Sequence, residues 1–410
     1  MYEWNEQQRQ IRQMVRRFIE AEIAPNLDRW EHDGEPPYDV LRKFAATFGL
    51  PDMARAQFRA QIERERAQQA GQAPPERKPR DPDEARMMAA MRMIPIVELC
   101  RYSPGMVTAL GVSMGLTANA ILSRGTIAQK ERWALPLLTL EKIGAWAITE
   151  PGSGSDAFGA MRSTARRDGD GYVLNGSKTF ITNGPYADII VFICKLDEGN
   201  APKDRKIVSF VVDGDTPGLS RSKPLRKMGL HASPTGELFL EDVRVGRDRL
   251  LGESEDRAAG RAGAKETFTA ERTGVAAMAL GIIERCLDLC VQYAKERVQF
   301  GRPIGDFQLI QLKLAKMEVA RQNVENLVFK QIEMAGDGRS MTLAEASACK
   351  LYAAQAATEV AMEAVQLFGG NGYMAEYRVE QLARDAKVLQ IYGGTDEIQV
   401  THIARALLAE

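Results

Sequence analysis

Cysteine and histidine are scarce in this chain of 410 residues. The five cysteines are odd in number and scattered, and the three histidines, His32, His231 and His402, lie far apart. Such a set of cysteines does not form a disulfide framework, so we expect a reduced, cytoplasmic protein. No histidine has a second ligand at helical spacing, so no metal site is predicted. A nucleophile elbow and a P-loop are also missing, which argues against a serine hydrolase and a kinase.

An excess of either charge is missing as well. The 54 basic and 55 acidic residues give a net charge of −1, whereas a nucleic-acid binder needs a basic face. The N-terminus lacks the basic and apolar segments of a signal peptide. The longest uncharged run, residues 102–123, contains Gly105, Gly111 and Gly115 and several hydroxyl side chains. This run is too polar for a lipid-facing helix, so we predict a buried helix, no membrane span and no nucleic-acid partner.

The first 143 residues carry helical spacing and helix-capping signals. Ile11, Val15 and Phe18 recur at helical intervals, and residues 126–129 form a capping box after Gly125. We assign residues 1–143 to an N-terminal helical domain. Its residues 53–86 are crowded with Arg, Glu and Gln and then with proline. This composition favours a solvated helix that ends in a proline-rich loop, and a lid or a partner-docking element is the alternative.

Residues 144–250 show the pattern of strands. Residues 172–174 and 179–182 flank Asn175-Gly176, which is a typical hairpin turn, and residues 187–196 and 207–212 are runs of strand-forming residues. We therefore predict a central antiparallel β domain of about 100 residues.

The helical pattern returns in residues 251–410. Residues 254–263 are rich in Gly, Ala and charge and are interpreted as a hinge, and a long helix follows that carries Cys286 and Cys290, expected to pack in its core. Thr342 opens another helix with a capping box. The order of helices, strands and helices predicts a segregated α+β fold.

Three polar, glycine-rich segments are candidates for function. They are residues 146–156, 368–373 and 390–397. Small residues and free backbone N–H groups in such segments can surround a phosphate or a flat polar ring. Each segment taken alone is equally compatible with a structural turn.

Together, in this order and spacing, the segments resemble the acyl-CoA dehydrogenase family. The matching passages are residues 148–156, 178–184, 228–230, 297–308, 366–373 and 384–399. The resemblance covers nearly the whole chain outside residues 53–86. It implies an N-terminal helical domain, a central β domain and a C-terminal four-helix bundle. It also implies non-covalent FAD, an acyl-CoA substrate, an electron-transfer flavoprotein as electron acceptor, and a homotetramer built as a dimer of dimers.

The resemblance also implies roles for individual residues. The residues expected at the chain's own FAD are Trp146, Ile148, Thr149, Gly154, Ser155, Phe180, Ile181, Thr182, Thr395 and Glu397. The residues expected to reach the FAD of the neighbouring subunit are Arg297, Gln299, Phe300, Gln308, Gln366, Leu367, Gly369 and Gly370. The residues expected at the substrate are Ser155, Phe268, Thr269, Arg272, Tyr392 and Gly394. Core packing of Phe180 and Phe300, and a helix-surface position of Arg272, are the alternatives.

The family reaction needs a base for the weakly acidic α proton of the thioester. Most members place a glutamate directly after the tyrosine of the third segment, and here that position is Gly393. A minority, including the isovaleryl and long-chain enzymes, place it just before an arginine on the long helix, where this chain has Glu271-Arg272. Glu271 shares helical spacing with Val275, Met278 and Ile282, which predicts an inward carboxylate with a raised pKa. A solvated glutamate in the first helical turn is the alternative.

In the family, the backbone N–H at the position of Gly393 donates to the thioester oxygen. The resemblance implies that this contact is kept, because glycine retains the N–H. The chain is therefore expected to be an FAD-dependent acyl-CoA dehydrogenase of fatty acid metabolism, with Glu271 as base and a 2,3-enoyl-CoA as product. A family relative with other flavin chemistry, such as an enoyl-CoA reductase or a desulfinase, is one alternative. A non-catalytic acyl-CoA-binding scaffold is the other.

Overall fold

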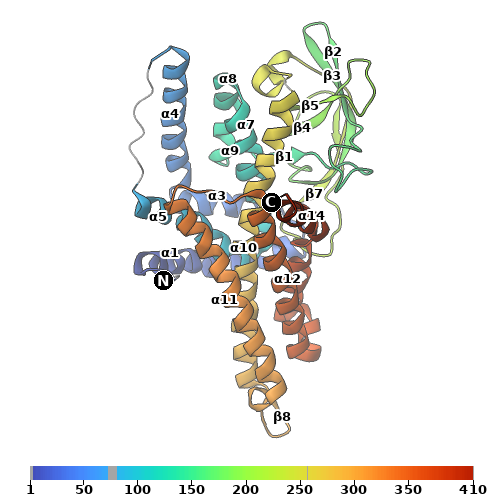
Figure 1. Cartoon of the computed structure of the whole chain (residues 1–410). Coiled ribbons are helices and arrows are strands. Elements are labelled where there is room, and N and C mark those ends of the chain that lie inside the picture. The colour runs from blue at the N-terminus through green and yellow to red at the C-terminus, as the bar shows by residue number, and fades with distance from the viewer. Residues whose placement is uncertain (1–2, 73–80, 256, 410) are drawn as a thin grey trace.

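The computed structural model describes residues 3–72, 81–255 and 257–409, and for residues 257–271 it describes the backbone alone. Helices of the N-terminal part, a β domain and a C-terminal set of long helices follow one another along the chain. In Figure 1 the β domain lies beside the upper half of helix α10 (Arg257–Glu296), and the long C-terminal helices extend away from it. The predicted α+β architecture with three segregated parts is confirmed.

The N-terminal part consists of short and medium helices. The α-helices are α1 (Glu6–Phe18), α2 (Leu27–Glu31), α3 (Tyr38–Thr47), α4 (Leu50–Gln69), α5 (Pro82–Cys100), α6 (Pro104–Leu110), α7 (Asn119–Arg124), α8 (Ile127–Gln129) and α9 (Leu135–Leu138). The predicted capping box is present, because Thr126 Oγ1 accepts from Gln129 N and the Gln129 side chain accepts from Thr126 N. The capping residues therefore start this helix where the sequence placed it.

The uncharged run predicted to be a buried helix spans α6, a π-helical stretch (Gly111–Ala118) and α7. Among the described residues, Pro104–Arg124 is the helical stretch long and apolar enough to cross a membrane, and 61% of its most apolar window is buried inside the protein. This burial matches the expected core helix. The wider i→i+5 turns of the π-helical stretch are a feature that often marks functional sites.

Helix α4 and the start of α5 form the charged insertion. Phe58 and Ile62 are the buried residues of α4, and they join a cluster that includes Trp133 and Trp146. Ion pairs at the helix rim, such as Lys130 to Glu65 at 2.6 Å, add to this contact. The expected solvated helix is therefore present but amphipathic. Residues 73–80 of the predicted proline-rich loop lie outside the described residues.

The β domain is a single mixed sheet. Its strands are β1 (Gly144–Ala147), β2 (Thr164–Asp168), β3 (Gly171–Thr182), β4 (Ile189–Leu196), β5 (Lys206–Asp213), β6 (Leu219–Arg221) and β7 (Thr235–Val245). The order is β1-β4-β2-β3-β7-β6, and β5 pairs with β4. The predicted β domain is confirmed, but it is not wholly antiparallel, because β4 runs parallel to both β1 and β2.

The predicted hairpin turn at Asn175-Gly176 is wrong. Strand β3 runs through both residues, and the β2–β3 pairing turns between Asp168 and Gly171. A register shift against β7 occurs at Asn175-Gly176 instead. Gly176 has φ +151°, and a Cβ there would lie 2.2 Å from Ser163 Oγ, so glycine is required for a β-bulge.

The C-terminal part is built around α10, α11 (Gln308–Gly336) and α12 (Leu343–Phe368), with α13 (Val379–Val388) and α14 (Asp396–Leu407) packed on α12. A two-stranded hairpin of β8 (Val298–Gln299) and β9 (Arg302–Pro303) follows α10. The predicted hinge at residues 254–263 is wrong from Arg257 onward, because α10 already begins there. Cys286 and Cys290 are fully buried, which confirms their predicted core position.

Helix α10 passes very close to α5 at Gly281. A Cβ at this position would lie 2.2 Å from the carbonyl oxygen of Val97 and 2.8 Å from Cys100 Cβ. Absence of a side chain therefore permits the contact between the N-terminal and C-terminal parts.

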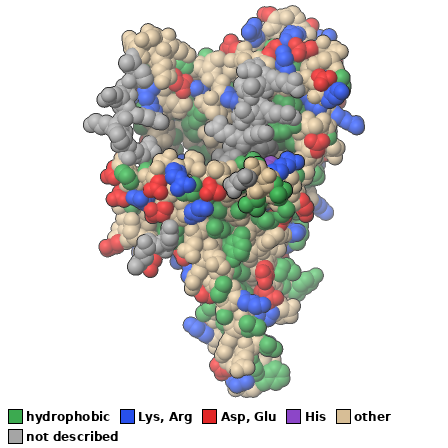
Figure 2. Space-filling view, in the orientation of Figure 1, with side chains coloured by type: hydrophobic (Ala, Val, Ile, Leu, Met, Phe, Trp, Pro, Cys, Tyr) green, Lys and Arg blue, Asp and Glu red, His purple; other side chains and the backbone are tan. Residues whose placement is uncertain are grey.

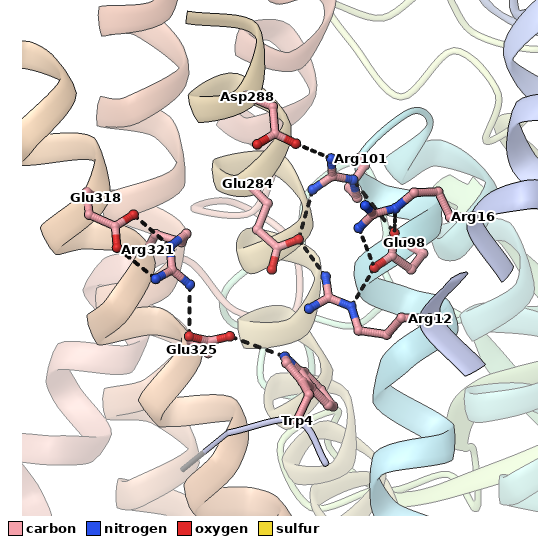
Figure 3. A network of polar contacts seen from close by, with 10 residues as sticks. All are labelled: Trp4, Arg12, Arg16, Glu98, Arg101, Glu284, Asp288, Glu318, Arg321 and Glu325. Carbon is pink, nitrogen blue, oxygen red and sulfur yellow. Dashed lines mark hydrogen bonds and ion pairs between the residues drawn. The ribbon is translucent and has the colours of Figure 1, made fainter. Parts of the chain in front are cut away.

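A network of ion pairs reinforces the junction of α1, α5 and α10 (Figure 3). The carboxylate of Glu98, fully buried, accepts from Arg12 at 2.6 Å and from Arg16 at 2.9 Å. Glu284 accepts from Arg12 at 2.6 Å and from Arg101 at 2.8 Å. The hydrophobic core and this network together fix the helical frame on which the candidate site is built.

Candidate active site

The first glycine-rich segment leaves the sheet at the end of β1. Trp146 and Ile148 are buried, Thr149 is half-buried, and Gly154 and Ser155 are exposed. Glu150 and Ser153 exchange backbone hydrogen bonds of 3.2 and 3.0 Å, which close a tight turn. The buried first half therefore anchors a turn whose second half faces outward.

A buried ion pair supports this turn from beneath. Lys178 Nζ, on β3, donates to Glu150 Oε1 at 2.8 Å and to the carbonyl oxygen of Ile148 at 3.0 Å. Glu150 also accepts from the backbone N–H groups of Arg162 and Ser163. Burial alone would raise the pKa of Glu150, but the Lys178 charge and these hydrogen bonds hold it below its ordinary value. Burial lowers the pKa of Lys178, and the charge of Glu150 opposes that shift. The contacts of Lys178 and Glu150 fix the segment to the sheet.

The end of β3 lies against the same segment. Thr179 N donates to the carbonyl oxygen of Thr149 at 2.9 Å. Phe180 has φ +56° and is 70% exposed, Ile181 is buried, and Thr182 is half-buried. The core-packing alternative for Phe180 is thus wrong, because the register shift between Lys178 and Ile181 turns its side chain out of the sheet. An exposed aromatic ring and a hydroxyl group therefore lie beside the glycine-rich turn.

Asn183 is a buried polar residue that sequence reasoning missed. It has φ +63°, accepts from Tyr38 Oη at 3.0 Å, and donates to the carbonyl oxygens of Ala109 and Gly144 at 2.9 Å each. These bonds join α3, α6 and β1 directly behind Thr182. The Asn-Gly dipeptide after a strand was the available signal, since asparagine tolerates positive φ.

The third segment is a loop before α14, and three helices hold it. Arg272 Nε of α10 donates to the carbonyl oxygen of Gly393 at 3.2 Å, and Lys350 Nζ of α12 donates to that of Gly394 at 2.8 Å. Gln399 Nε2 of α14 donates to both carbonyls, at 3.2 and 2.7 Å. Arg272 is 4% exposed, so its surface alternative is wrong. Sequence reasoning missed Lys350 and Gln399.

The remaining residues of this loop flank the two glycines. Tyr392 Oη lies 3.3 Å from Met278 Sδ, and Thr395 caps α14 by accepting from Ile398 N. Hydrogen bonds from a backbone N–H and from Thr395 hold the pKa of the exposed Glu397 below its ordinary value. Phe268, Thr269 and Glu271 belong to the stretch of α10 whose side chains lie outside the described part of the chain.

The eight residues assigned to a neighbouring subunit's cofactor lie apart from the glycine-rich turn after β1 and from the loop before α14. Arg297, Gln299 and Phe300 belong to the β8–β9 hairpin, which Figure 1 shows at the end of the bundle far from the β domain. Phe300 is 94% exposed, so its core-packing alternative is wrong too. Gln308 and Gln366 are exposed and Leu367 is buried, and Gly369 and Gly370 follow α12. The rings of Tyr293 and Phe368 stack with their centroids 4.0 Å apart. This contact connects the end of α10, which leads into the β8–β9 hairpin, with the end of α12.

The comparisons with known proteins agree with this arrangement. Family models named acyl-CoA dehydrogenase match the N-terminal domain at residues 5–54, the middle domain at 145–243 and the C-terminal domain at 258–408. A short-chain specific acyl-CoA dehydrogenase from Megasphaera elsdenii is 41% identical over 316 residues, which are 77% of this chain and 81% of the relative. The chain belongs to the acyl-CoA dehydrogenase family. It is accordingly an oxidoreductase.

Other members of the acyl-CoA dehydrogenase family match over almost the full length. A 3-(aryl)acrylate reductase from Clostridium sporogenes is 37% identical, and a caffeyl-CoA reductase–Etf complex subunit from Acetobacterium woodii is 36% identical, each over 99% of both chains. Butyryl-CoA dehydrogenase from Megasphaera elsdenii has a TM-score of 0.82 at 34% identity and 99% coverage of both chains. A glutaryl-CoA dehydrogenase from Mycobacterium smegmatis in complex with FADH2 has a TM-score of 0.82 at 27% identity, covering 99% of this chain and 95% of the other.

Proposed function

We propose that this protein is an FAD-dependent acyl-CoA dehydrogenase that uses Glu271 as its base. The observation that carries the proposal is the hydrogen bond from Arg272 Nε to the carbonyl oxygen of Gly393, at 3.2 Å. It joins the residue next to Glu271 to the loop position where most family members keep the base, which supports the assignment of Glu271. A glutamate at either position can therefore serve the same reaction, and this chain has it on the helix.

FAD is the cofactor of this oxidoreductase family, and the first segment is suited to it. Among the described residues, no atom lies within 4 Å of the place where a Cβ on Gly152 or Gly154 would stand. Phe180 offers an exposed ring, and Thr149 and Thr182 offer hydroxyl groups beside this open backbone. We assign these residues, with Trp146, Ile148, Ser155, Ile181, Thr395 and Glu397, to the flavin of the same chain. When bound, FAD supplies the hydride acceptor of the reaction.

The chain's own residues then handle the proton and the developing charge. Glu271 takes the proton from the carbon α to the thioester, and the β carbon loses a hydride, so the product is a 2,3-enoyl-CoA. The backbone N–H of Gly393 donates to the thioester oxygen, where negative charge develops, and such a donor stabilises the transition state. Ser155, Phe268, Thr269, Arg272, Tyr392 and Gly394 are assigned to the acyl-CoA site.

A homotetramer built as a dimer of dimers completes this proposal. The bundle exposes large apolar side chains, among them Leu309 (75% exposed), Leu312 (52%) and Met362 (55%). Figure 2 shows hydrophobic side chains gathered over the bundle half of the molecule. Because exposed apolar surface of this kind marks contact regions, we assign it to a second copy of the chain. The β8–β9 hairpin and residues 366–370 then reach the FAD of that copy.

An electron-transfer flavoprotein is the proposed electron acceptor, and fatty acyl-CoA oxidation in the cytoplasm is the proposed setting. The relative from Acetobacterium woodii, described as a subunit of a reductase–Etf complex, supports this partner. The same relative and the arylacrylate reductase favour one second candidate, reduction of a 2,3-unsaturated acyl group by the same residues in the reverse direction.

Anaerobic flavin spectroscopy tests the proposal. We expect purified wild type to be yellow and to lose its flavin absorbance when one of a panel of acyl-CoA thioesters is added. Glu271→Gln should bind the same thioester but lose the absorbance about 10²–10⁴-fold more slowly, the usual contribution of a positioned base. Glu296→Gln, at the exposed end of α10, is the matched control and should behave as wild type.

Each contrary outcome has a separate meaning. Unchanged reduction by Glu271→Gln would remove the assignment of the base. A chemically reduced enzyme that is reoxidised by 2,3-enoyl-CoA, with no reduction by any saturated thioester, would favour the reductase. Absence of both reactions in yellow wild type would favour a non-catalytic acyl-CoA-binding scaffold.

A further inference from the structure

Two adjacent glycines in the loop before α14 are held from the inside of the protein. Gly393 has φ +61° and Gly394 has φ +90°. The carbonyl oxygens of both accept hydrogen bonds from buried side chains, which are Arg272, Lys350 and Gln399. Lys350 and Gln399 are fully buried, and Arg272 is 4% exposed. The two carbonyls are thus fixed toward the helices by groups that solvent cannot reach.

The buried position of Lys350 is unfavourable for the free energy of folding. Its side chain is fully buried on the alanine-rich helix α12, and burial of a charge costs several kcal/mol unless it is paired. Its carboxylate neighbour, Asp396 Oδ1, lies 3.5 Å away, whereas the Gly394 carbonyl oxygen lies at 2.8 Å. Lys350 therefore donates to the loop backbone at hydrogen-bonding distance.

The loop needs such an external restraint. A glycine has access to far more backbone conformations than any other residue, and here two occur in succession where most of the family has a glutamate before the second. Fixing the carbonyl groups of both glycines restricts φ and ψ at Gly394 and fixes the peptide plane that follows Gly393. The N–H of Gly393 precedes that plane by one residue, so its direction depends on how firmly the plane is held. Among the described residues, no acceptor is hydrogen-bonded to this N–H. It is thus available to a ligand.

We propose that Lys350 is a positioning residue for the substrate, with Gln399 in a lesser role. Lys350 holds the carbonyl of Gly394 inward, so that the N–H of Gly393 keeps its aim at the thioester oxygen of acyl-CoA. The inference rests on the proposed function, because it assumes that a thioester binds at this loop. It predicts that loss of Lys350 weakens stabilisation of an enolate more than it weakens binding of a neutral thioester.

Binding of acetoacetyl-CoA to the FAD-loaded enzyme tests this without turnover. Its enolate carries the negative charge on the oxygen that Gly393 N–H would contact, and its formation is followed by absorbance as pH is varied. We expect wild type to lower the pKa of the bound ligand below that of free acetoacetyl-CoA. Lys350→Met should raise that pKa by about 1–2 units relative to wild type, and kcat should fall by about 10²-fold with little change in KM.

Three further variants complete the test. Lys350→Arg, which can still donate to the Gly394 carbonyl, should restore part of the pKa shift. Gln399→Met should shift the pKa in the same direction by less, about half a unit. Lys330→Met removes a half-exposed lysine whose carboxylate neighbour, Glu345, lies 3.6 Å away, and it should titrate as wild type.

The outcomes separate the inference from the proposed function. A folded, FAD-loaded Lys350→Met that titrates as wild type overturns the role of Lys350. If that variant does not fold, an unchanged titration of Gln399→Met overturns the claim that buried donors to the glycine carbonyls position the N–H of Gly393. Wild type that leaves the acetoacetyl-CoA pKa unchanged overturns the oxyanion contact and the inference together. Wild type that lowers this pKa but reduces no acyl-CoA contradicts the dehydrogenase reaction and leaves the positioning role in force.

Discussion

The molecule buries charge at two domain junctions, and the two clusters are built in opposite ways. At the junction of α1, α5 and α10, Glu98 and Glu284 each accept hydrogen bonds from two arginines (Figure 3). At the junction of α2, the loop before β7 and α13, Glu31 has no guanidinium at hydrogen-bonding distance among the described residues, and the nearest ring nitrogen of His231 lies 3.7 Å from its Oε2. Carboxylates with and without a guanidinium partner are thus equally buried in one chain.

The difference is visible in the direction of the pKa shifts. Burial alone would raise the pKa of Glu98, but Arg16, Arg12 and Arg101 hold it below the ordinary value. Burial and the charge of Asp385 raise the pKa of Glu31 to about 8. Burial decides the sign only where no guanidinium is within hydrogen-bonding distance. The two junctions should therefore respond to pH in opposite directions.

Removal of the paired carboxylate should have the largest effect. Glu98→Gln leaves Arg12, Arg16 and Arg101 with an uncompensated share of buried positive charge, and we expect it to lower the free energy of unfolding by about 3–5 kcal/mol. Urea denaturation at fixed protein concentration measures this. Because the folded-state pKa is lowered, the contribution of Glu98 is present above about pH 4.5 and is lost as pH falls through the lower folded value.

The exposed pair of Arg9 and Glu3 provides the control for that experiment. Their side chains are 61% and 63% exposed, and the closest N–O distance is 3.4 Å. Glu3→Gln should change the free energy of unfolding by less than about 0.5 kcal/mol. Equal effects of the two substitutions would contradict the importance assigned to the buried network.

Substitution of Glu31, which lacks a guanidinium partner, should have a smaller effect and the opposite pH dependence. The folded protein keeps a proton on Glu31 between about pH 4.5 and 8, whereas the unfolded chain releases it, so wild-type stability should fall as pH rises through this range. Glu31→Gln removes this loss and should be about 1–3 kcal/mol more stable relative to wild type at pH 8 than at pH 4.5. Parallel stability profiles of the two proteins would show that Glu31 is ionised at all these pH values.

The lysine beside Glu31 should show the smallest effect. Burial lowers the pKa of Lys227 to about 8. Between about pH 8 and 10.5 the folded lysine has lost its proton and the unfolded one has not, so this group makes stability rise with pH. In Lys227→Met that rise, about 1 kcal/mol, should be missing from denaturation curves measured at pH 8 and 10. Its persistence would assign the rise to another group.

Features set by neighbouring residues could be predicted from the sequence. The capping boxes at Thr126 and Thr342 form as expected, because the cap and its partner lie three residues apart. The resemblance to the acyl-CoA dehydrogenase family placed the three parts of the fold in order. Arg272 was singled out as a substrate residue, and its contact with the Gly393 carbonyl, 121 residues away, was not foreseen.

Features set by distant residues could not be predicted in this way. Asn175-Gly176 forms a bulge and not a turn because pairing with β7 continues on both sides of it. Lys350 meets Gly394 across 44 residues, and Asn183 meets Tyr38 across 145. The residues around Lys350 in its alanine-rich helix do not indicate which distant group its ammonium will contact. Such contacts require the three-dimensional packing of several elements.

Because α10 is one continuous helix of 40 residues, a change at one point of it can displace distant parts of the protein. Such a helix is a strut of about 60 Å, and it touches the Gly393 loop through Arg272 and leads into the β8–β9 hairpin at its other end. Any side chain at Gly281 would push α10 away from α5, because a Cβ there would collide with the carbonyl oxygen of Val97. A substitution at Gly281, far from both ends of the helix, would then displace the Gly393 loop and the β8–β9 hairpin together.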